Sequence, residues 1–282
     1  MRGVPIVFDE SQSIFSLHDF RAGRVAPPEQ SRLHAFALRH LPSLELNVPA
    51  RANCALLVDL LLRGESSPLV LNLGGKHGAA AAASLRSNPR VRCVEGHVGL
   101  APQTDLIVDP AALPFDDGVF DAVLADAVLE HVVDPKRVVA EIHRVLKTGG
   151  VVYSDVPFML GVHGGRYDFE RWSALAHRRL FRGFEEVRSG VSSGPAAALA
   201  NSIQSFLLSF VARRGFRFAI KALCRLLLSW LKYLDLWLTT QPGAVDAALG
   251  TYFIGLRSVR ILSDRELIGS YRGATPDLYG PG

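Results

Sequence analysis

The chain has 282 residues, of which 49% are hydrophobic, with a mean hydropathy of +0.19 and a formal net charge of +4. This length and composition allow a sizeable core in one large domain, or in one domain with a subdomain. The sequence pI near 9.1 permits an anionic partner or membrane surface without demanding one.

The cysteine pattern and the N-terminus narrow the class of protein. Cys54, Cys93 and Cys224 are far apart and form no Cys-x-x-Cys pair, which argues against a disulfide framework or a zinc site and indicates a reducing compartment. Residues 1–20 lack the continuous apolar region of a secretory signal. No uncharged apolar run approaches the roughly 20 residues of a membrane span. We therefore expect a cytoplasmic protein without a bound metal, with a peripheral position on the inner membrane face as an open alternative.

Short apolar strands alternate with helical segments along residues 50–157, after an uneven N-terminal extension that we expect to pack on or over the main domain. This alternation predicts parallel strands with helical crossovers, which is a doubly wound, Rossmann-like α/β sheet. Two later strands bring the expected sheet to seven, with an apolar helical insertion between the last two. The expected strands are 69–73, 90–95, 105–109, 120–125, 151–157, 185–191 and 251–256, and the expected helices are 50–63, 78–87, 134–146 and 170–181.

A glycine-rich turn follows the first expected strand, and ligands of such sheets lie beyond the carboxyl ends of the strands. The phosphate-binding loop needs Gly-x-x-x-x-Gly-Lys-Ser/Thr, but His77 follows Gly75–Lys76. The dinucleotide fingerprint needs Gly-x-Gly-x-x-Gly, and counting from Gly74 its later glycines would fall on Lys76 and Ala79. The sequence therefore excludes both a phosphate-binding loop and a dinucleotide-binding fingerprint at this turn.

The most specific pattern lies in residues 105–157, which read DLIVDPAALPFDDGVFDAVLADAVLEHVVDPKRVVAEIHRVLKTGGVVYSDVP. A strand ending in Asp, a Leu-Pro-Phe turn, a Phe-Asp strand, a Leu-Glu-His segment and a helix closing in Leu-Lys-x-Gly-Gly follow one another in order. This segment resembles the class I methyltransferases of the type 11 group, strongly over residues 69–158 and less so over 159–190. The resemblance implies S-adenosylmethionine as cofactor and methyl transfer as the reaction.

The resemblance also implies the cofactor contacts. Glu95 would accept hydrogen bonds from the ribose diol, because a carboxylate offers acceptors to two neighbouring hydroxyls, and Asp109 would accept from the adenine amino group. Either could instead be an ordinary strand-end carboxylate. The positions expected at the cofactor, from its methionine part through the ribose and adenine to the sulfonium, are Asn72, Gly74, Gly75, Gly78, Glu95, Asp109, Ala111, Leu113, Asp126 and Ala127.

Methyl transfer from a sulfonium is a direct displacement, so the enzyme mainly aligns the groups and excludes water. If a hydroxyl is methylated, His131 is the first candidate base because histidine titrates near neutral pH, followed by His163, Tyr167 and Asp168. In the alternative interpretation, His131 only bonds to backbone and Tyr167 only packs in its loop. The polar residues of helix 134–146, among them Glu141 and Arg144, are expected on a solvated face.

Two residues of the turn depart from the family pattern. Asn72 stands where the family has an acid, and Lys76 stands where it has glycine. Asparagine can still hydrogen-bond but lacks the charge that favours a cationic group. Lysine can crowd the cofactor, add a charge near the sulfonium or point to solvent. The alternative function is therefore a catalytically impaired scaffold or binding protein on the same fold, acting through its apolar hairpin.

That hairpin consists of two expected helices, 195–212 and 216–238, and the second carries a cationic stripe of Arg217, Lys221 and Arg225 on an apolar helix. It could lie on a membrane surface, cover an apolar substrate as a lid, or form a core or dimer interface. The segment after the fifth strand, Pro-Phe followed by His-x-x-x-Tyr-Asp-Phe, resembles methyltransferases of bacterial cell-surface glycan assembly. This implies a small-molecule or lipid-linked acceptor, with a glycan intermediate among the candidates.

Nucleic acid is not an expected partner, because basic residues do not interleave with exposed aromatics outside the hairpin. The expected organisation of the chain has five parts. The parts are the N-terminal extension 1–49, the methyltransferase core 50–194, the hairpin insertion 195–245, the final core strand 246–258 and the polar tail 259–282.

Overall fold

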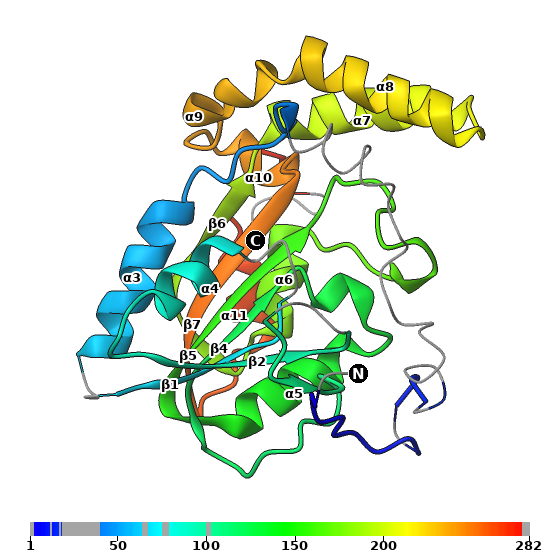
Figure 1. The fold of residues 1–282 in the computed structure, drawn as a ribbon. Helices are drawn as coiled ribbons and strands as arrows, with labels where there is room; N and C mark the ends of the chain where they lie inside the picture. Colours follow the sequence, from blue (N-terminus) through cyan, green and yellow to red (C-terminus); the bar gives the residue numbers. More distant parts are fainter. Residues whose placement is uncertain are drawn as a thin grey trace.

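The computed structural model describes residues 3–11, 13–16, 18, 40–63, 67–74, 79–99 and 103–277. Its centre is a sheet of seven strands in the order β3-β2-β1-β4-β5-β7-β6 (Figure 1). The first five strands are parallel, and β7 runs antiparallel to both β5 and β6. The strands are β1 (Leu69–Asn72), β2 (Arg92–His97), β3 (Leu106–Ile107), β4 (Phe120–Asp126), β5 (Leu146–Pro157), β6 (Phe184–Ser193) and β7 (Gly250–Arg257). The predicted Rossmann-like α/β class and the insertion between the last two strands are confirmed.

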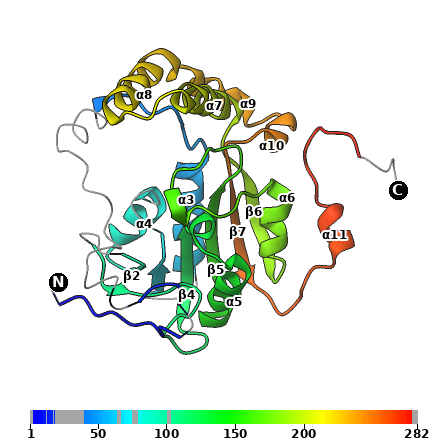
Figure 2. The same cartoon turned by 90° about the vertical axis from the view of Figure 1, so that its right-hand side faces the viewer.

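Helices cover both faces of the sheet (Figure 2). On one face, α3 (Ala50–Leu62) and α4 (Ala79–Arg86) bury apolar side chains such as Leu57 and Leu85 against the strands. On the other face, α5 (Pro135–Val145) and α6 (Ala174–Leu180) do the same with Ile142 and their neighbours. The central strands are therefore apolar on both sides, and polar groups are concentrated where the strands end.

Local signals set the limits of these helices. Asp134 caps α5 by accepting the backbone N–H of Arg137 at 3.0 Å, and Pro135 occupies the first helical position. The helix expected over 170–181 is shorter, because the Ser173 side chain caps α6 at its own position. A sequence pattern of apolar spacing does not reveal which of several polar residues becomes the cap.

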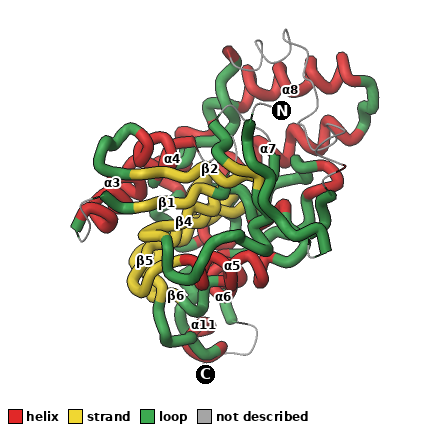
Figure 3. Tube along the Cα trace, turned by 60° about the horizontal axis from the view of Figure 1, so that its bottom comes forward, coloured by secondary structure: helices red, strands yellow, loops and turns green. Residues whose placement is uncertain are grey.

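The insertion between β6 and β7 is a helical hairpin outside the layer of strands (Figure 3). It consists of α7 (Pro195–Ser209) and α8 (Arg214–Leu228), followed by the short turns η3 (Leu231–Tyr233), α9 (Asp235–Leu238) and α10 (Gly243–Asp246). The expected second helix over 216–238 is thus broken after Leu228. Asp235 is fully buried and accepts the backbone N–H groups of Ala196 and Ala197 at 2.9 and 3.0 Å, which fixes the end of the insertion to the start of α7.

The hairpin lies at the edge of the sheet where the parallel strands end. Pro157 at the end of β5 pairs with Gly250, and Gly250 also pairs with Ser193, two residues before α7. The loop after β5 approaches α7 closely, since a Cβ at Gly161 would lie 3.0 Å from Oγ of Ser205. The carboxyl edge of the sheet is therefore bordered by this hairpin and loop.

Candidate functional site

Polar side chains from several strands meet at the carboxyl edge of the sheet. Asn72 at the end of β1 is in register with Glu95 on β2 and with Leu124 on β4. Asp126 at the end of β4 is in register with Asp155 on β5. The parallel register therefore brings together the residues that the sequence placed after successive strands.

Asn72 is the central link between the first two strands. Its amide nitrogen donates to Oε2 of Glu95 at 2.7 Å, and its oxygen accepts the backbone N–H of Gly74 at 3.1 Å. Arg86 donates to the other oxygen of Glu95 at 2.8 Å. Burial opposes ionisation of Glu95, but the hydrogen bonds from His97 and Asn72 and the charge of Arg86 hold its pKa below the usual value.

The expectation that Glu95 ends its strand is wrong, because β2 continues to His97 and Glu95 is only 4% exposed. The strand is longer because the two residues after Glu95 pair with β3, through Gly96 opposite Leu106 and His97 opposite Ile107. The side chains of Asn72, Arg86 and His97 already contact the Glu95 carboxylate, and its contact with a ribose stays a prediction.

Gly74 is required by a close approach of two strand ends. A Cβ at this position would lie 2.7 Å from the carbonyl oxygen of Asp126. Only glycine lets the turn after β1 pass so near to the end of β4. Gly75 and Gly78, which were predicted at the cofactor, and the unusual Lys76 lie outside the described residues.

Asp109 follows β3 and is held by a segment that the sequence did not connect to it. Its Oδ1 accepts the backbone N–H of Ala111 at 2.8 Å, and its Oδ2 accepts the hydroxyl of Ser13 at 2.5 Å. The N-terminal segment reaches this point by running beside β3, with Ile6 bridged to Ile107. Asp109 is only 5% exposed as a result.

The turn that carries Leu113 is anchored by α5, contrary to the expected solvated face. Glu141 accepts the backbone N–H of Leu113 at 2.8 Å. Arg144 donates to the carbonyl oxygens of Leu113 and Phe115 at 2.9 and 2.7 Å, and to both oxygens of Glu141. The Leu-Pro-Phe turn folds back over α5, so these two charged side chains hold the wall of the site.

Acidic groups gather after β4 and β5. Burial raises the pKa of Asp126 to about 6 and that of Glu130 to about 7, and burial together with the Asp126 charge raises the pKa of Asp155 well above its usual value. Ala127, directly after β4, adopts a positive φ of 52°. A positively charged ligand group would stabilise the ionised forms of these carboxylates. Asp155 and Glu130 were not among the predicted site residues, although both lie in the motifs that carried the family resemblance.

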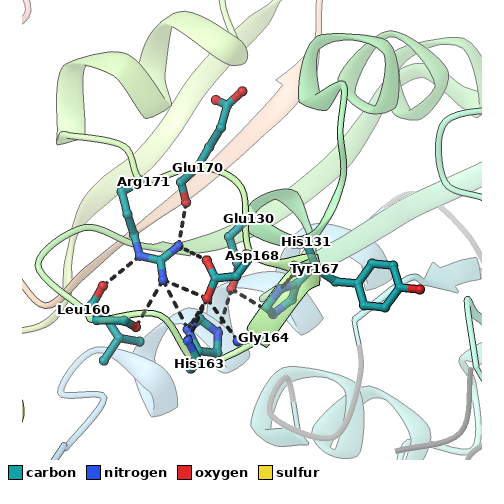
Figure 4. A network of polar contacts seen from close by, with 10 residues as sticks. Glu130, His131, Leu160, His163, Gly164, Tyr167, Asp168, Glu170 and Arg171 are labelled. Carbon is teal, nitrogen blue, oxygen red and sulfur yellow. Dashed lines mark hydrogen bonds and ion pairs between the residues drawn. The ribbon is translucent and has the colours of Figure 1, made fainter. Parts of the chain in front are cut away.

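The loop after β5 brings His163 onto His131 (Figure 4). The two rings lie edge to face with centroids 4.9 Å apart. Gly164 permits this approach, since a Cβ there would lie 2.5 Å from the ring of His131. Nδ1 of His131 lies 2.6 Å from the carbonyl oxygen of Tyr167, so the backbone bond considered for this histidine is present. The Tyr167 ring itself points away from the histidines (Figure 4).

Asp168 organises the loop. It accepts the backbone N–H groups of His163 and Gly164 at 2.7 and 3.0 Å and pairs with Arg171 at 2.5 Å. Burial acts against ionisation, but the Arg171 guanidinium and these backbone bonds hold the pKa of Asp168 far below its usual value. The sequence named Asp168 only as a candidate base, and the structure shows that its carboxylate is engaged as the anchor of this loop.

Comparisons with known proteins bear on this arrangement. Residues 76–154 match the family described as "Methyltransferase domain". Three proteins of Mycobacterium sp. (strains KMS, JLS and MCS), each described as an uncharacterized methyltransferase, are 36% identical over 104 residues, which make up 34% of this chain and 41% of theirs. The chain thus spans about two fifths of the length of the curated relatives it matches.

Similar solved structures include two with TM-scores of 0.46 and 0.45. The first is a geranyl diphosphate C-methyltransferase from Streptomyces coelicolor A3(2), 12% identical, with 83% of this chain and 86% of that chain covered. The second is the [4+2]-cyclase SpnF, 18% identical, with 74% of this chain and 82% of that chain covered.

Proposed function

We propose that the chain transfers the methyl group of S-adenosylmethionine to a small-molecule or lipid-linked acceptor, because residues 76–154 match the family described as "Methyltransferase domain". The observation that carries the proposal is the convergence of Gly74, Asp109 and Asp126 at one edge of the sheet, each at the end of a different strand. That edge is where doubly wound sheets bind their ligands.

The residues present fit the cofactor chemically. A glycine at position 74 leaves the backbone open to close approach, and Asp109 offers acceptor capacity to an amino group. Asp126 and Asp155 are half-buried. Desolvation disfavours the anions of both, and the charge of Asp126 further disfavours that of Asp155, so the cationic amino and sulfonium groups of the cofactor would stabilise the ionised forms.

When bound, S-adenosylmethionine supplies a methyl group on an activated sulfonium. The protein's task is to align the acceptor with that methyl group and to receive a proton where the acceptor is a hydroxyl. His131 and His163 present Nε2 towards the carboxylate of Glu130, at 3.9 and 3.7 Å from its Oε1. We assign to this cluster the activation of the acceptor, with Tyr167 contributing its backbone carbonyl rather than its phenol.

Titration with S-adenosylhomocysteine by calorimetry tests the cofactor site. We expect binding to the wild type, and at least tenfold weaker binding to Asp109→Asn, because the carboxylate becomes a poorer acceptor for the adenine amino group. Asp116→Asn is the matched control, since Asp116 is an exposed aspartate in the nearby turn. The proposal is overturned by a wild type that shows no binding at high micromolar ligand, and the site placement by an unchanged affinity of Asp109→Asn.

The surface of the hairpin supports a location of this reaction at a membrane. The predicted stripe of Arg217, Lys221 and Arg225 is half-buried in the structure, and Arg217 donates to the carbonyl oxygens of Leu208 and Val211 at the end of α7. The polar side of α8 therefore faces inward, and its outer side is apolar. The exposed large apolar residues of the hairpin and the turns that follow it are Leu199, Phe206, Leu207, Phe210, Phe216, Leu223, Leu226, Leu227, Trp230, Tyr233, Leu234, Leu236 and Trp237.

We infer that this apolar face contacts an anionic membrane surface. The sequence between residues 195 and 234 contains no Asp or Glu, while Arg213 and Arg214 are exposed at the turn of the hairpin. Exposed Trp and Leu beside such cations are typical of segments that lie in the headgroup region of a bilayer. Among the described helices, none has the length and apolarity to cross a bilayer. A lipid-linked acceptor would be presented at this surface, next to the carboxyl edge of the sheet.

Co-sedimentation with vesicles of phosphatidylcholine and phosphatidylglycerol tests the membrane contact. We expect the wild type to pellet with the vesicles and the triple variant Leu226→Ser/Leu227→Ser/Trp230→Ser to stay in the supernatant. Val259→Ser is the control, because Val259 is 96% exposed and lies outside the hairpin. Equal partitioning of the wild type and the triple variant would rule out this surface as the membrane contact, whatever the outcome of the cofactor titration.

A further inference from the structure

Three side chains with metal-ligating atoms converge at the start of the loop after β5. Glu130 and His131 lie in the turn η1 (Leu129–His131), and His163 comes from the loop (Figure 4). Oε1 of Glu130 lies 3.9 Å from Nε2 of His131 and 3.7 Å from Nε2 of His163, and one ligand atom from each residue lies within 4.8 Å of the others. Residues far apart in the sequence are thus brought to a common point.

Glu130 needs a partner that the described residues do not supply. Its side chain is 1% exposed, and its Oε2 has no hydrogen-bond partner in the described part of the chain. A buried carboxylate oxygen without a partner has lost its hydration without a compensating hydrogen bond, which is unfavourable. A carboxylate in this setting is therefore placed to gain from a bound cation.

Both histidines are oriented with their second nitrogen atoms already engaged. Nδ1 of His131 donates to the carbonyl oxygen of Tyr167 at 2.6 Å. Nδ1 of His163 lies 3.3 Å from Oδ2 of Asp168 and 3.4 Å from a nitrogen of Arg171, and metal binding requires the tautomer in which this Nδ1 carries the proton and faces the carboxylate. Each Nε2 then keeps its lone pair. Metal-bound histidines are supported in this way by a carbonyl or a carboxylate on the opposite ring nitrogen.

Two imidazoles and one carboxylate form the ligand set of many catalytic zinc sites, in which a fourth position stays open. His131 and His163 are 31% and 36% exposed, so the cluster opens towards solvent on the side away from Glu130. Bonds of about 2.0–2.1 Å to a tetrahedral ion would place the ligand atoms about 3.4 Å apart. The distances from Oε1 of Glu130 to the two Nε2 atoms would therefore have to shorten by about half an ångström or less. That is within the reach of side-chain rotation.

We propose that Glu130, His131 and His163 bind one divalent transition-metal ion of the Zn²⁺ type. Asp168 and Arg171 are the charged groups next to His163, and Asp126 and Asp155 act on Glu130 from β4 and β5, so carboxylates outnumber the single guanidinium around the cluster. The sequence had predicted no metal centre, because that prediction considered cysteine ligands and this set contains none. The binding itself does not depend on methyl transfer.

A consequence for the reaction rests on the proposed function. An acceptor hydroxyl oxygen would take the open position, where the ion lowers its pKa and its proton leaves to solvent. The O–C bond to the methyl group would then form as the S–C bond of the cofactor breaks. His131 and His163 would thus activate the acceptor through the ion and would not receive the proton directly.

Calorimetric titration of the EDTA-treated full chain with ZnCl₂, without any S-adenosyl compound, tests the proposal. We expect one tight site in the wild type and at least tenfold weaker binding in His163→Ala and in Glu130→Gln. His40→Ala is the control, because His40 is an exposed histidine outside the cluster and should leave the titration unchanged. MgCl₂ should show no comparable site, since Mg²⁺ prefers oxygen ligands.

Co²⁺ provides a second, spectroscopic readout. Its visible d–d absorption should appear in the wild type and in His40→Ala and be lost in His163→Ala, which lies in a surface loop and is expected to fold. Zinc and cobalt titrations that are the same for the wild type, His163→Ala and Glu130→Gln would overturn the site. A titration with S-adenosylhomocysteine in the presence of EDTA distinguishes failure of the metal site from failure of the cofactor site, because it reports cofactor binding alone.

Discussion

The side-chain amide of Asn72 donates a 2.7 Å hydrogen bond to the carboxylate of Glu95, and this bond accounts for the residue that departs from the family pattern. An acid at position 72 would place a second carboxylate against Glu95, which is only 4% exposed. Asparagine keeps the acceptor that Gly74 needs and adds a donor for Glu95. The departure is therefore built into a continuous network and is not by itself a sign of a lost site.

This relationship predicts the effect of Asn72→Asp. The change removes the donor to Glu95 and adds a like charge beside it, so we expect a loss of about 1–3 kcal/mol in the free energy of unfolding at pH 7. The loss should shrink at pH 5, because one carboxylate of the pair then takes up a proton and donates to the other. Urea denaturation at both pH values measures it. Asn88→Asp is the control, since its oxygen can still accept the backbone N–H of Arg90. An unchanged stability of Asn72→Asp at pH 7 would contradict the network.

Ser13 and Asp109 are 96 residues apart in the sequence, and their hydrogen bond places the N-terminal segment at the predicted adenine position. If the cofactor's amino group uses Oδ2 of Asp109, it has to displace the hydroxyl of Ser13. We therefore expect Ser13→Ala to bind S-adenosylhomocysteine about two- to tenfold more tightly, as a net hydrogen bond is worth about 0.5–1.5 kcal/mol. Ser11→Ala is the control, because Ser11 donates to Asp9 instead. Weaker binding to Ser13→Ala in calorimetry would show that Ser13 supports the site and does not compete for it.

Arg144 should matter more than its place on the polar side of α5 indicates. Arg144→Met removes the donors to the carbonyl oxygens of Leu113 and Phe115, so we expect a loss of about 2–4 kcal/mol in stability and weaker binding of S-adenosylhomocysteine. Arg144→Lys should be intermediate, because one ammonium group cannot reproduce the fork of a guanidinium. Lys136→Met, on an exposed position of the same helix, is the control in urea denaturation. If Arg144→Met lost no more stability than Lys136→Met, Arg144 would have no greater structural role than an ordinary residue of the solvated face.

Local patterns in the sequence were enough to predict the strands, the covering helices and the edge of the sheet where the site lies. Apolar runs predicted the strands and helical spacing predicted the helices, while the parallel order of the strands predicted the edge of the sheet at which the site lies. The bond from Ser13 to Asp109 and the fold of the Leu-Pro-Phe turn onto Arg144 depend on tertiary contacts that periodicity does not encode. The sequence left the direction of α8 open for the same reason, because an amphipathic pattern shows that a helix has two sides but does not determine which side packs inward.

His177 gives a prediction that is independent of cofactor and metal. Nε2 lies 3.0 Å from the hydroxyl of Ser154, Nδ1 lies 3.1 Å from that of Thr251, and the side chain is 1% exposed. Burial, with the charge of Arg178 as the smaller cause, lowers the pKa of His177 to about 3. In the unfolded chain, His177 has a pKa near 6.5 and takes up a proton below that pH, whereas in the folded chain it stays neutral down to about pH 3. Its contribution to the free energy of unfolding is therefore fully present above about pH 6.5 and is lost as the pH falls towards 3.

Between pH 7 and pH 5 this linkage should lower the free energy of unfolding by about 2 kcal/mol. His177→Gln can still bond to both hydroxyls but does not titrate, so its stability should fall by that much less over the same interval, even if the variant is less stable at pH 7. Guanidinium chloride denaturation at the two pH values measures the difference, and contributions from all other groups cancel in the comparison. His40→Gln, at an exposed position, should follow the wild type. Parallel pH dependences of the wild type and His177→Gln would show that the folded chain protonates His177 as readily as the unfolded one does.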